Sequence, residues 1–310
     1  MWREHEPGRF VVGINLPWVG YGTDVGASAW FPEGGLSHQP EALERLDRTL
    51  ARIACDGISV VRVFLLCDAR SGVRFDGCGF PLGLDEFVLP DIDAMLAVAR
   101  RHQVGLMPVL LDFHLCAAAQ LANGVQLGGH ARVVTDADAR RACIDRVLRP
   151  IVERFANDEA VIAWDVMNEP DWCLRGGPLM RGTAVPFDAL QRFLGEAVAC
   201  VQQSARQPVT IGCAGTRSLD LVAALGLDFF QVHWYERFGW PALAGPVAAL
   251  GLPRRPVILG EFGGRGTRIA DVLDAARQAG YAGALVWSAL ADDEQSAYPP
   301  ALSEWIRAST

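Results

Sequence analysis

The chain is a succession of short apolar runs, each followed by polar residues and then by a further patterned segment. The runs are too short for buried helices. Several, such as residues 59–66, are mostly continuous rather than alternating, which is typical of parallel strands covered on both faces. The predicted strands are residues 10–17, 59–66, 105–114, 161–169, 208–213, 228–235, 256–261 and 283–288.

Helical periodicity follows these runs. It is clearest at residues 41–56, whose leucines recur at helical spacing and which Gly57 can terminate. Pro150 should kink or split the longest of the predicted helices. The helical pattern at residues 240–250 is weak, because Gly245-Pro246 interrupts it. The other predicted helices are residues 90–102, 136–157, 187–204, 218–225, 240–250, 268–278 and 300–308.

The order of these elements predicts the fold class. Strict alternation of strands and helices implies a parallel sheet, and eight such units imply closure into a barrel. We therefore predict an α/β fold, a single (β/α)8 TIM barrel in which residues 1–310 form one domain, since no linker or shift in composition divides the sequence. In such barrels the carboxyl ends of the strands line one mouth, where function resides.

Composition narrows the classes of function. Apolar residues make up 51% of the chain and charged residues 21%, which favours a large core. The net charge of −8 argues against nucleic acid and anionic membranes as partners, because both require clustered basic residues. No apolar run reaches about 18 residues, and the N-terminus lacks a basic-then-apolar signal. We expect a cytoplasmic protein, although a secreted protein whose signal had been removed would have the same sequence.

The residue types exclude some chemistry outright. All 28 basic residues are arginine, so a Schiff-base lysine and a P-loop lysine are both impossible. The eight cysteines form no CxxC pair, and their spacing to histidine matches no zinc site. Their even number allows disulfides, which a chain with a large core does not need. We predict neither a metal centre nor a cofactor.

Two of the predicted strands end in a glutamate. The strand that begins at residue 161 closes with Asn168-Glu169, just before Pro170, and the strand that begins at residue 256 ends at Glu261. Strand-end carboxylates that meet at one barrel mouth are suited to acid/base and nucleophilic attack on a glycosidic bond. A separation of about 5–5.5 Å between them would give retention of the anomeric configuration.

Other polar and aromatic residues occupy the same strand ends. Aromatic faces stack on the C–H faces of pyranose rings, and amide, imidazole and guanidinium groups hydrogen-bond to sugar hydroxyls. This set favours sugar chemistry over a metal-dependent hydrolase, because its histidines are scattered one to a strand. Its members are Arg62, Asp112, His114, Asn168, His233, Trp234, Tyr235 and Trp287.

The ordered set of motifs resembles the retaining clan A (β/α)8 glycoside hydrolases, and most of all glycoside hydrolase family 5 with its cellulase and mannanase relatives. The matching pieces fall on six of the eight predicted strands in the order of the clan, so the resemblance covers essentially the whole chain. They are Val-Val-Arg62-Val, Asp-Phe-His114, Asn168-Glu169-Pro170, His233-Trp-Tyr235, Leu-Gly-Glu261-Phe-Gly and Val-Trp287-Ser.

The resemblance implies a retaining β-glycoside hydrolase that works by double displacement, with Glu169 as acid/base and Glu261 as nucleophile. Asn168 resembles the residue that binds the sugar 2-hydroxyl. Arg62 and Tyr235 resemble the pair that keeps the nucleophile ionised. A cation and a hydroxyl donor should lower the pKa of Glu261, while a less polar site keeps Glu169 protonated.

The remaining matches are substrate contacts. His114 and His233 resemble residues that touch the substrate or the acid/base, and Trp287 resembles the platform under the reacting sugar. The family often has glycine after the histidine of the third strand, whereas this chain has Leu115, which leaves the role of His114 open. A strand-end histidine can also be a satisfied core residue.

The sequence leaves the substrate open between a β-mannan and a β-glucan type of polysaccharide. One alternative is an exo-acting intracellular β-glycosidase on short oligosaccharides or glycosides, since the loops at residues 18–40, 67–88 and 116–134 decide between groove and pocket. A second is a non-catalytic sugar-binding barrel, against which both intact glutamates argue. Four loop tryptophans are as suited to covering loops as to stacking on sugars: Trp18, Trp30, Trp172 and Trp240.

Overall fold

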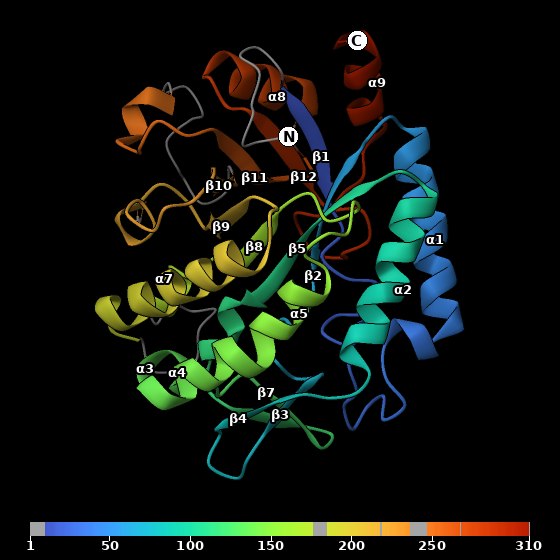
Figure 1. The fold of residues 1–310 in the computed structure, drawn as a ribbon. Helices are drawn as coiled ribbons and strands as arrows, with labels where there is room; N and C mark the ends of the chain where they lie inside the picture. The colour runs from blue at the N-terminus through green and yellow to red at the C-terminus, as the bar shows by residue number, and fades with distance from the viewer. Residues whose placement is uncertain (1–9, 176–184, 218, 236–246, 267, 310) are drawn as a thin grey trace.

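The computed structural model describes residues 10–175, 185–217, 219–235, 247–266 and 268–309. Its centre is a closed barrel of parallel strands in the order β1-β12-β11-β10-β9-β8-β5-β2 (Figure 1). Each barrel strand therefore pairs with the barrel strands that come before and after it in the sequence, and β12 closes the barrel by pairing with β1. The predicted (β/α)8 barrel is confirmed.

All eight barrel strands lie where the apolar runs predicted them. Every residue of β2, β8, β9, β11 and β12 is buried, as expected for parallel strands covered on both faces. The strands are β1 Val11–Asn15, β2 Val60–Phe64, β5 Gly105–Asp112, β8 Trp164–Asn168, β9 Val209–Cys213, β10 Phe230–Trp234, β11 Val257–Gly263 and β12 Gly283–Trp287.

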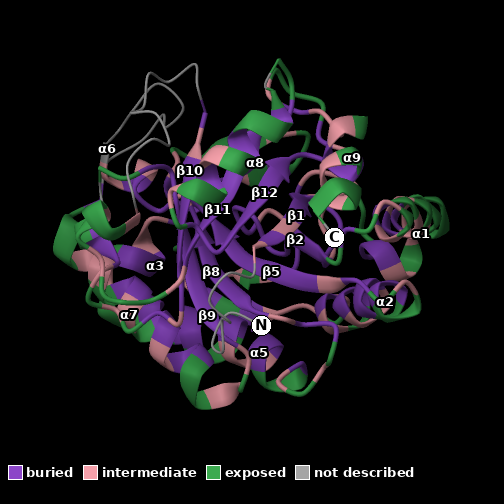
Figure 2. Ribbon diagram, turned by 90° about the horizontal axis from the view of Figure 1, so that it is seen from above, coloured by how far each residue is buried: buried purple, intermediate pink, exposed green. Residues whose placement is uncertain are grey.

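Helices surround the barrel, and Figure 2 shows their exposed outer faces around the buried strands. None of the helices in the described ranges is long and apolar enough to cross a membrane. The helices are α1 Pro40–Cys55, α2 Val88–Arg101, α3 Arg132–Thr135, α4 Ala137–Cys143, α5 Arg149–Arg154, α6 Trp172–Arg175, α7 Phe187–Ser204, α8 Ile269–Gln278 and α9 Pro300–Ser309.

Pro150 splits the long helix, as predicted. A π-helical turn at Ile144–Leu148 separates α4 from α5. Proline has no N–H to donate, and its ring crowds the carbonyl four residues back, so the helix widens just before it. The split is therefore a direct consequence of one residue in an otherwise regular amphipathic pattern.

One predicted helix is shorter than expected, and another lies partly outside the described residues. Of residues 218–225, the described part from 219 on contains only a 3₁₀ turn at Leu219–Leu221, because so short a segment before Gly226 does not offset the cost of nucleating an α-helix. Of residues 240–250, the part from 247 on forms the 3₁₀ turn Val247–Leu250, and residues 240–246, including Trp240, lie outside the described residues.

Two β-hairpins extend from the carboxyl ends of the barrel strands, where the sequence predicted loops. The first pairs β3 Val73–Phe75 with β4 Pro81–Leu84, and the second pairs β6 Gln120–Ala122 with β7 Val125–Leu127. The second turns at Asn123-Gly124, which both have positive φ, the combination that a tight hairpin turn requires. These hairpins add walls to the mouth of the barrel.

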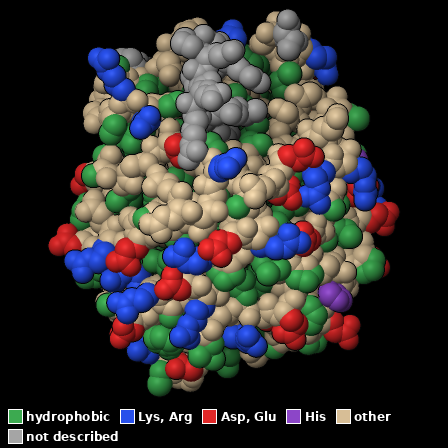
Figure 3. All heavy atoms as spheres, viewed as in Figure 1, with side chains coloured by type: hydrophobic (Ala, Val, Ile, Leu, Met, Phe, Trp, Pro, Cys, Tyr) green, Lys and Arg blue, Asp and Glu red, His purple; other side chains and the backbone are tan. Residues whose placement is uncertain are grey.

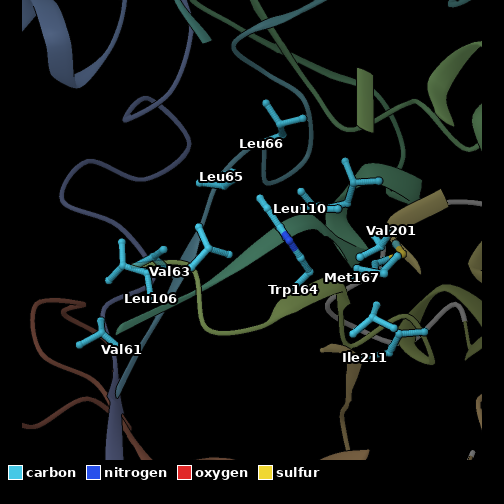
Figure 4. Packing of buried hydrophobic residues seen from close by; sticks show 14 of the residues in the cluster. Val61, Val63, Leu65, Leu66, Leu106, Leu110, Trp164, Met167, Val201 and Ile211 are labelled. Carbon is cyan, nitrogen blue, oxygen red and sulfur yellow. The ribbon is translucent and has the colours of Figure 1, made fainter. Parts of the chain in front are cut away.

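The core forms two main clusters and a small third one at the mouth of the barrel. The larger lies between barrel and helices, where Trp164 packs among Leu110, Met167 and their neighbours (Figure 4). The smaller fills the floor of the barrel with Val60, Met107, Phe229, Ile258 and Leu285. An apolar floor leaves the mouth end of the barrel interior for polar groups.

Acidic and basic side chains are interspersed on the face of the molecule that Figure 3 shows. Mixed charge of this kind is ordinary for a soluble surface and differs from the basic stripe that nucleic-acid binding requires. The charges that matter to function lie instead inside the barrel.

Candidate active site

Strand geometry aims the polar residues inward. Side chains of a strand alternate between its two faces, so every second residue of β2 points into the barrel. From the floor to the mouth these residues are Val60, Arg62 and Phe64. On β8 the register against β9 shifts between Asp165 and Asn168, and similar shifts occur along β11. Such bulges re-aim side chains, and here they turn the strand-end residues toward the mouth.

Arg62 is the centre of a buried polar layer above the floor. The side chain is fully buried, and its Nε and Nη2 lie 2.9 Å from Oδ2 of Asp165. Nη1 donates to Glu261 Oε1 at 2.6 Å and to Asn15 Oδ1 at 3.2 Å, and Nη2 donates to Asn168 Oδ1 at 2.9 Å. One guanidinium thus orients four side chains from three different strands, β1, β8 and β11.

Glu261 is held on both carboxylate oxygens. Oε1 accepts from Arg62, and Oε2 accepts from the Tyr235 hydroxyl at 2.7 Å. Burial raises the pKa of Glu261 above its ordinary value, while His233, Arg62 and Tyr235 lower it. The two donors that the sequence identified, Arg62 and Tyr235, do lower the pKa of Glu261, but burial outweighs them. Those donors still orient Glu261 and favour its ionised form.

Glu169 occupies a strained backbone position directly after β8. Its φ is 46°, in the left-handed region that residues other than glycine rarely adopt, and its N–H donates to the carbonyl of Gly212 at 2.7 Å. Strain of this kind gathers at functional sites, where surrounding contacts enforce it. The turn points the carboxyl group toward Glu261.

The surroundings of Glu169 favour its protonated form. Oε1 lies 2.8 Å from Nδ1 of His233, and Oε2 accepts from the indole N–H of Trp172 at 2.9 Å. Burial, reinforced by the negative charge of Asp112, raises the pKa of Glu169 to about 7. The predicted protonation of Glu169 near neutral pH is therefore consistent with the structure.

His233 lies between the two glutamates. Its Nδ1 is 2.8 Å from Glu169 and 3.4 Å from Glu261, and burial lowers the pKa of the imidazole to about 4. Among the described residues Nε2 has no hydrogen-bond partner. We assign the ring hydrogen to Nδ1, since the ionised form of either glutamate can only accept a hydrogen bond there. A neutral His233 thus donates to whichever glutamate is ionised.

A cavity of about 500 Å³ opens above these groups. Six of the eight predicted site residues line it, and Arg62 and His233 lie beneath. Trp287 donates its indole N–H to Asp293 at 2.8 Å, and Trp18 packs edge-on against Trp287 and against Phe64. The lining is Trp18, Tyr21, Phe64, Asp112, Phe113, His114, Asn168, Glu169, Trp172, Tyr235, Glu261, Trp287, Asp293, Glu294 and Gln295.

The loop tryptophans divide into two kinds. Trp18 and Trp172 line the cavity, so both face the space where a substrate would bind. Trp30 instead donates its N–H to the carbonyl of Ala122 at 3.0 Å, which ties the loop at residues 18–40 to the β6–β7 hairpin. Trp30 therefore holds two loops together and does not line the cavity.

One trio in the described part of the chain has metal-ligand geometry. One potential ligand atom from each of Glu169, His233 and Glu261 lies within 4.8 Å of the others. A divalent cation there would share the Glu261 carboxylate with the guanidinium of Arg62, and the like charges would repel. The trio fits carboxylate chemistry better than metal binding.

Sequence reasoning missed several residues of this site. Asp112 was noticed at its strand end but given no role, although it bonds to both Asn168 and His114. Its position two residues before His114 was the available signal. Asp293 comes from a loop, where no periodicity shows which side chains turn inward.

Comparison with known proteins agrees with this geometry. No family model matches the sequence. The chain is 25% identical to a mannan endo-1,4-beta-mannosidase of Mytilus edulis, over 90% of this chain and 83% of the relative. It is 21% identical to the enzyme of the same name from Cryptopygus antarcticus, over 90% of this chain and 80% of the relative.

A solved structure shares the fold. The endo-1,4-beta-mannanase from Eisenia fetida superposes with a TM-score of 0.77 and 24% identity, covering 96% of this chain and 90% of that one. The resemblance to clan A glycoside hydrolases that the motifs indicated is confirmed, and so is the class of enzyme, a glycoside hydrolase.

Proposed function

We propose that this chain is a retaining endo-β-1,4-mannanase, in which residues 1–310 act as one catalytic domain. The observation that carries the proposal is the approach of Glu169 and Glu261, whose nearest carboxylate oxygens lie within 4.8 Å at the floor of a cavity. That spacing suits the retaining mechanism, since an inverting pair stands about 6.5–9.5 Å apart to admit a water. The names of the relatives support mannan as substrate.

In the first step Glu261 attacks the anomeric carbon while Glu169 transfers its proton to the departing glycosidic oxygen. The C–O bond to the leaving sugar breaks, and an ester bond between Glu261 and the sugar forms. Arg62 and Tyr235 hold Glu261 in line, and their donors favour the carboxylate that attacks. Glu169 begins protonated because its pKa is raised to about 7.

In the second step the roles of Glu169 reverse. The ionised Glu169 takes a proton from water, the resulting oxygen attacks the anomeric carbon, and Glu261 leaves as a carboxylate. His233 then donates to Glu169, which is 2.8 Å away, instead of to Glu261. Both residues return to their starting protonation states.

Substrate contacts follow from the residues around this pair. Asn168 presents its amide to the 2-hydroxyl of the reacting sugar, and Trp287 stacks beneath that sugar. His114, which also lines the cavity, donates to a sugar hydroxyl. Trp172 bonds to Glu169 and so lies on the leaving-group side, where its ring can stack on the departing sugar.

The test combines substrates with matched variants. Wild type should hydrolyse β-1,4-mannan faster than β-1,4-glucan and release a ladder of oligosaccharides, whereas release of mannose alone would show exo action. Glu261→Ala should lose activity. Glu294→Gln, which changes a carboxylate at the rim of the same cavity, should keep it. Binding of oligosaccharides without hydrolysis by wild type would favour a sugar-binding barrel.

Azide rescue assigns the acid/base. Glu169→Ala should slow substrates with poor leaving groups far more than activated aryl mannosides, because activated groups depart without a proton. Added azide should restore its turnover on the aryl substrate by replacing the water that Glu169 activates. Equal losses on both substrates would remove Glu169 from this role.

A further inference from the structure

Asp112 is the last residue of β5, and it lies beside Asn168 of β8, with which it is paired in the sheet. Only 3% of Asp112 is exposed, and both of its carboxylate oxygens are used. Oδ1 accepts from the backbone N–H of His114 at 2.8 Å and contacts the Nδ1 of the same residue. Oδ2 accepts from the Asn168 amide at 2.8 Å. No step of the proposed mechanism yet uses this carboxylate.

The first consequence concerns the Asn168 amide, which is held from both ends. Arg62 donates to its Oδ1 at 2.9 Å, and Asp112 accepts one hydrogen of its Nδ2. The orientation of the amide is therefore fixed, with oxygen toward the cation and nitrogen toward the anion. The second hydrogen of Nδ2 remains to donate into the cavity, so Asn168 offers a donor to the sugar 2-oxygen.

The second consequence concerns the charge of His114. Burial disfavours a charged imidazole, but the adjacent carboxylate of Asp112 outweighs it and raises the pKa of His114. The same pairing overcomes burial and lowers the pKa of Asp112. The ring stacks on Phe113 with centroids 4.0 Å apart, and 36% of the His114 side chain is exposed. Its Nε2–H is thus a cationic donor at the cavity wall.

The third consequence concerns Glu169. After burial, the charge of Asp112 is the largest influence that raises the pKa of Glu169, while Arg62 and His114 act in the opposite direction. The other charged groups that act on the Asp112–His114 pair are Asp68 and Arg70, from the segment after β2. Asp112 is therefore an anion that stabilises the proton of the catalytic acid.

We propose that Asp112 is a positioning residue of this reaction, which fixes the donor face of Asn168, keeps His114 charged and retains the proton on Glu169 until the leaving oxygen takes it. The proposal rests on the proposed function for its catalytic part. The effect of Asp112 on His114 is independent of any substrate, so the role of Asp112 and the proposed function can be tested separately.

The kinetic test is the pH profile of Asp112→Asn. We expect kcat on β-1,4-mannan to fall about ten- to a hundredfold, the usual effect of losing a hydrogen bond to a charged group. The basic limb of kcat/KM should move to lower pH. The movement is smaller than the charge of Asp112 alone would cause, because His114 loses its opposing charge in the same variant.

Two further variants make the result specific. His114→Gln removes the cation but leaves Asp112, so the basic limb should move to higher pH, opposite to Asp112→Asn. Asp91→Asn is the matched control, since Asp91 is also a buried carboxylate but accepts from backbone N–H groups of Gly26, Gly35 and Ser37, away from Asn168 and His114. Its basic limb should stay in place. Shifts of Asp112→Asn and His114→Gln in the same direction would overturn the proposal.

The second readout needs no substrate. The imidazole of His114, followed by NMR during a pH titration, should titrate above its ordinary pKa of 6.5 in wild type and lower in Asp112→Asn. Equal titration in both proteins would overturn the proposal even if wild type hydrolyses mannan. A wild type inactive on every glycan would overturn the proposed function alone, while a lowered His114 pKa in the variant would still support the pairing.

Discussion

Replacing Glu169 by glutamine should stabilise the protein at alkaline pH and not at acid pH. The carboxyl group has a raised pKa in the folded state, about 7 against 4.5 in the unfolded chain. A raised pKa means that the stability it contributes is complete below pH 4.5 and is lost as the pH rises through 7. Glutamine does not titrate, so the variant avoids this loss.

The magnitude follows from the shift. A difference of about 2.5 pKa units corresponds to about 3.4 kcal/mol, of which about 2.5 kcal/mol falls between pH 5 and pH 8.5. Glutamine also changes the hydrogen bonds with His233 and Trp172, but that effect is the same at both pH values because neither partner titrates between them. It cancels when the two pH values are compared.

The assay is urea unfolding of wild type and Glu169→Gln at pH 5 and pH 8.5. The stability of the variant relative to wild type should increase by about 2.5 kcal/mol between the two conditions. Glu294→Gln, which changes an exposed carboxylate at the rim of the cavity, is the control and should show no such increase. A relative stability of Glu169→Gln that is independent of pH would refute the reasoning about the buried acid.

Three other outcomes follow from the same contacts. Wild-type kcat/KM should fall above a pH of about 7 as Glu169 loses its proton, and this limb should be absent for Glu169→Gln acting on an activated aryl mannoside; its persistence there would assign the limb to another group. Arg62→Met should cost about 3–5 kcal/mol in urea unfolding, since it leaves Asp165 and Glu261 buried without their cation; a loss under 1 kcal/mol would contradict this. Trp172→Phe removes an N–H that favours ionised Glu169, so the basic limb should move to higher pH, and an unmoved limb would show that this bond does not affect the acid.

Much of the fold could be predicted because the signals are local. Continuous apolar runs mark each barrel strand, and Pro150 splits its helix through its own ring. Asn123-Gly124 is also a local signal, and the hairpin there could have been recognised from it. The helix at residues 218–225 was overestimated, since periodicity gives no measure of the length needed for nucleation.

The site could be predicted only as far as strand ends determine it. Glu169 and Glu261 were found because each ends an apolar run. The role of Asp112 depends on the register between β5 and β8, which no local pattern encodes. The net pKa shift of Glu261 depends on how deeply the barrel buries it, and sequence identifies its donors but not that depth.

The most direct test of the central claim is to trap the covalent intermediate. A 2-deoxy-2-fluoro mannoside with an activated leaving group forms the ester quickly and hydrolyses it slowly in a retaining enzyme. Intact mass spectrometry should show one sugar added to each protein molecule, and peptide mapping should place it on Glu261. A label on another residue, or hydrolysis of mannan with inverted configuration and no label, would contradict the double-displacement mechanism.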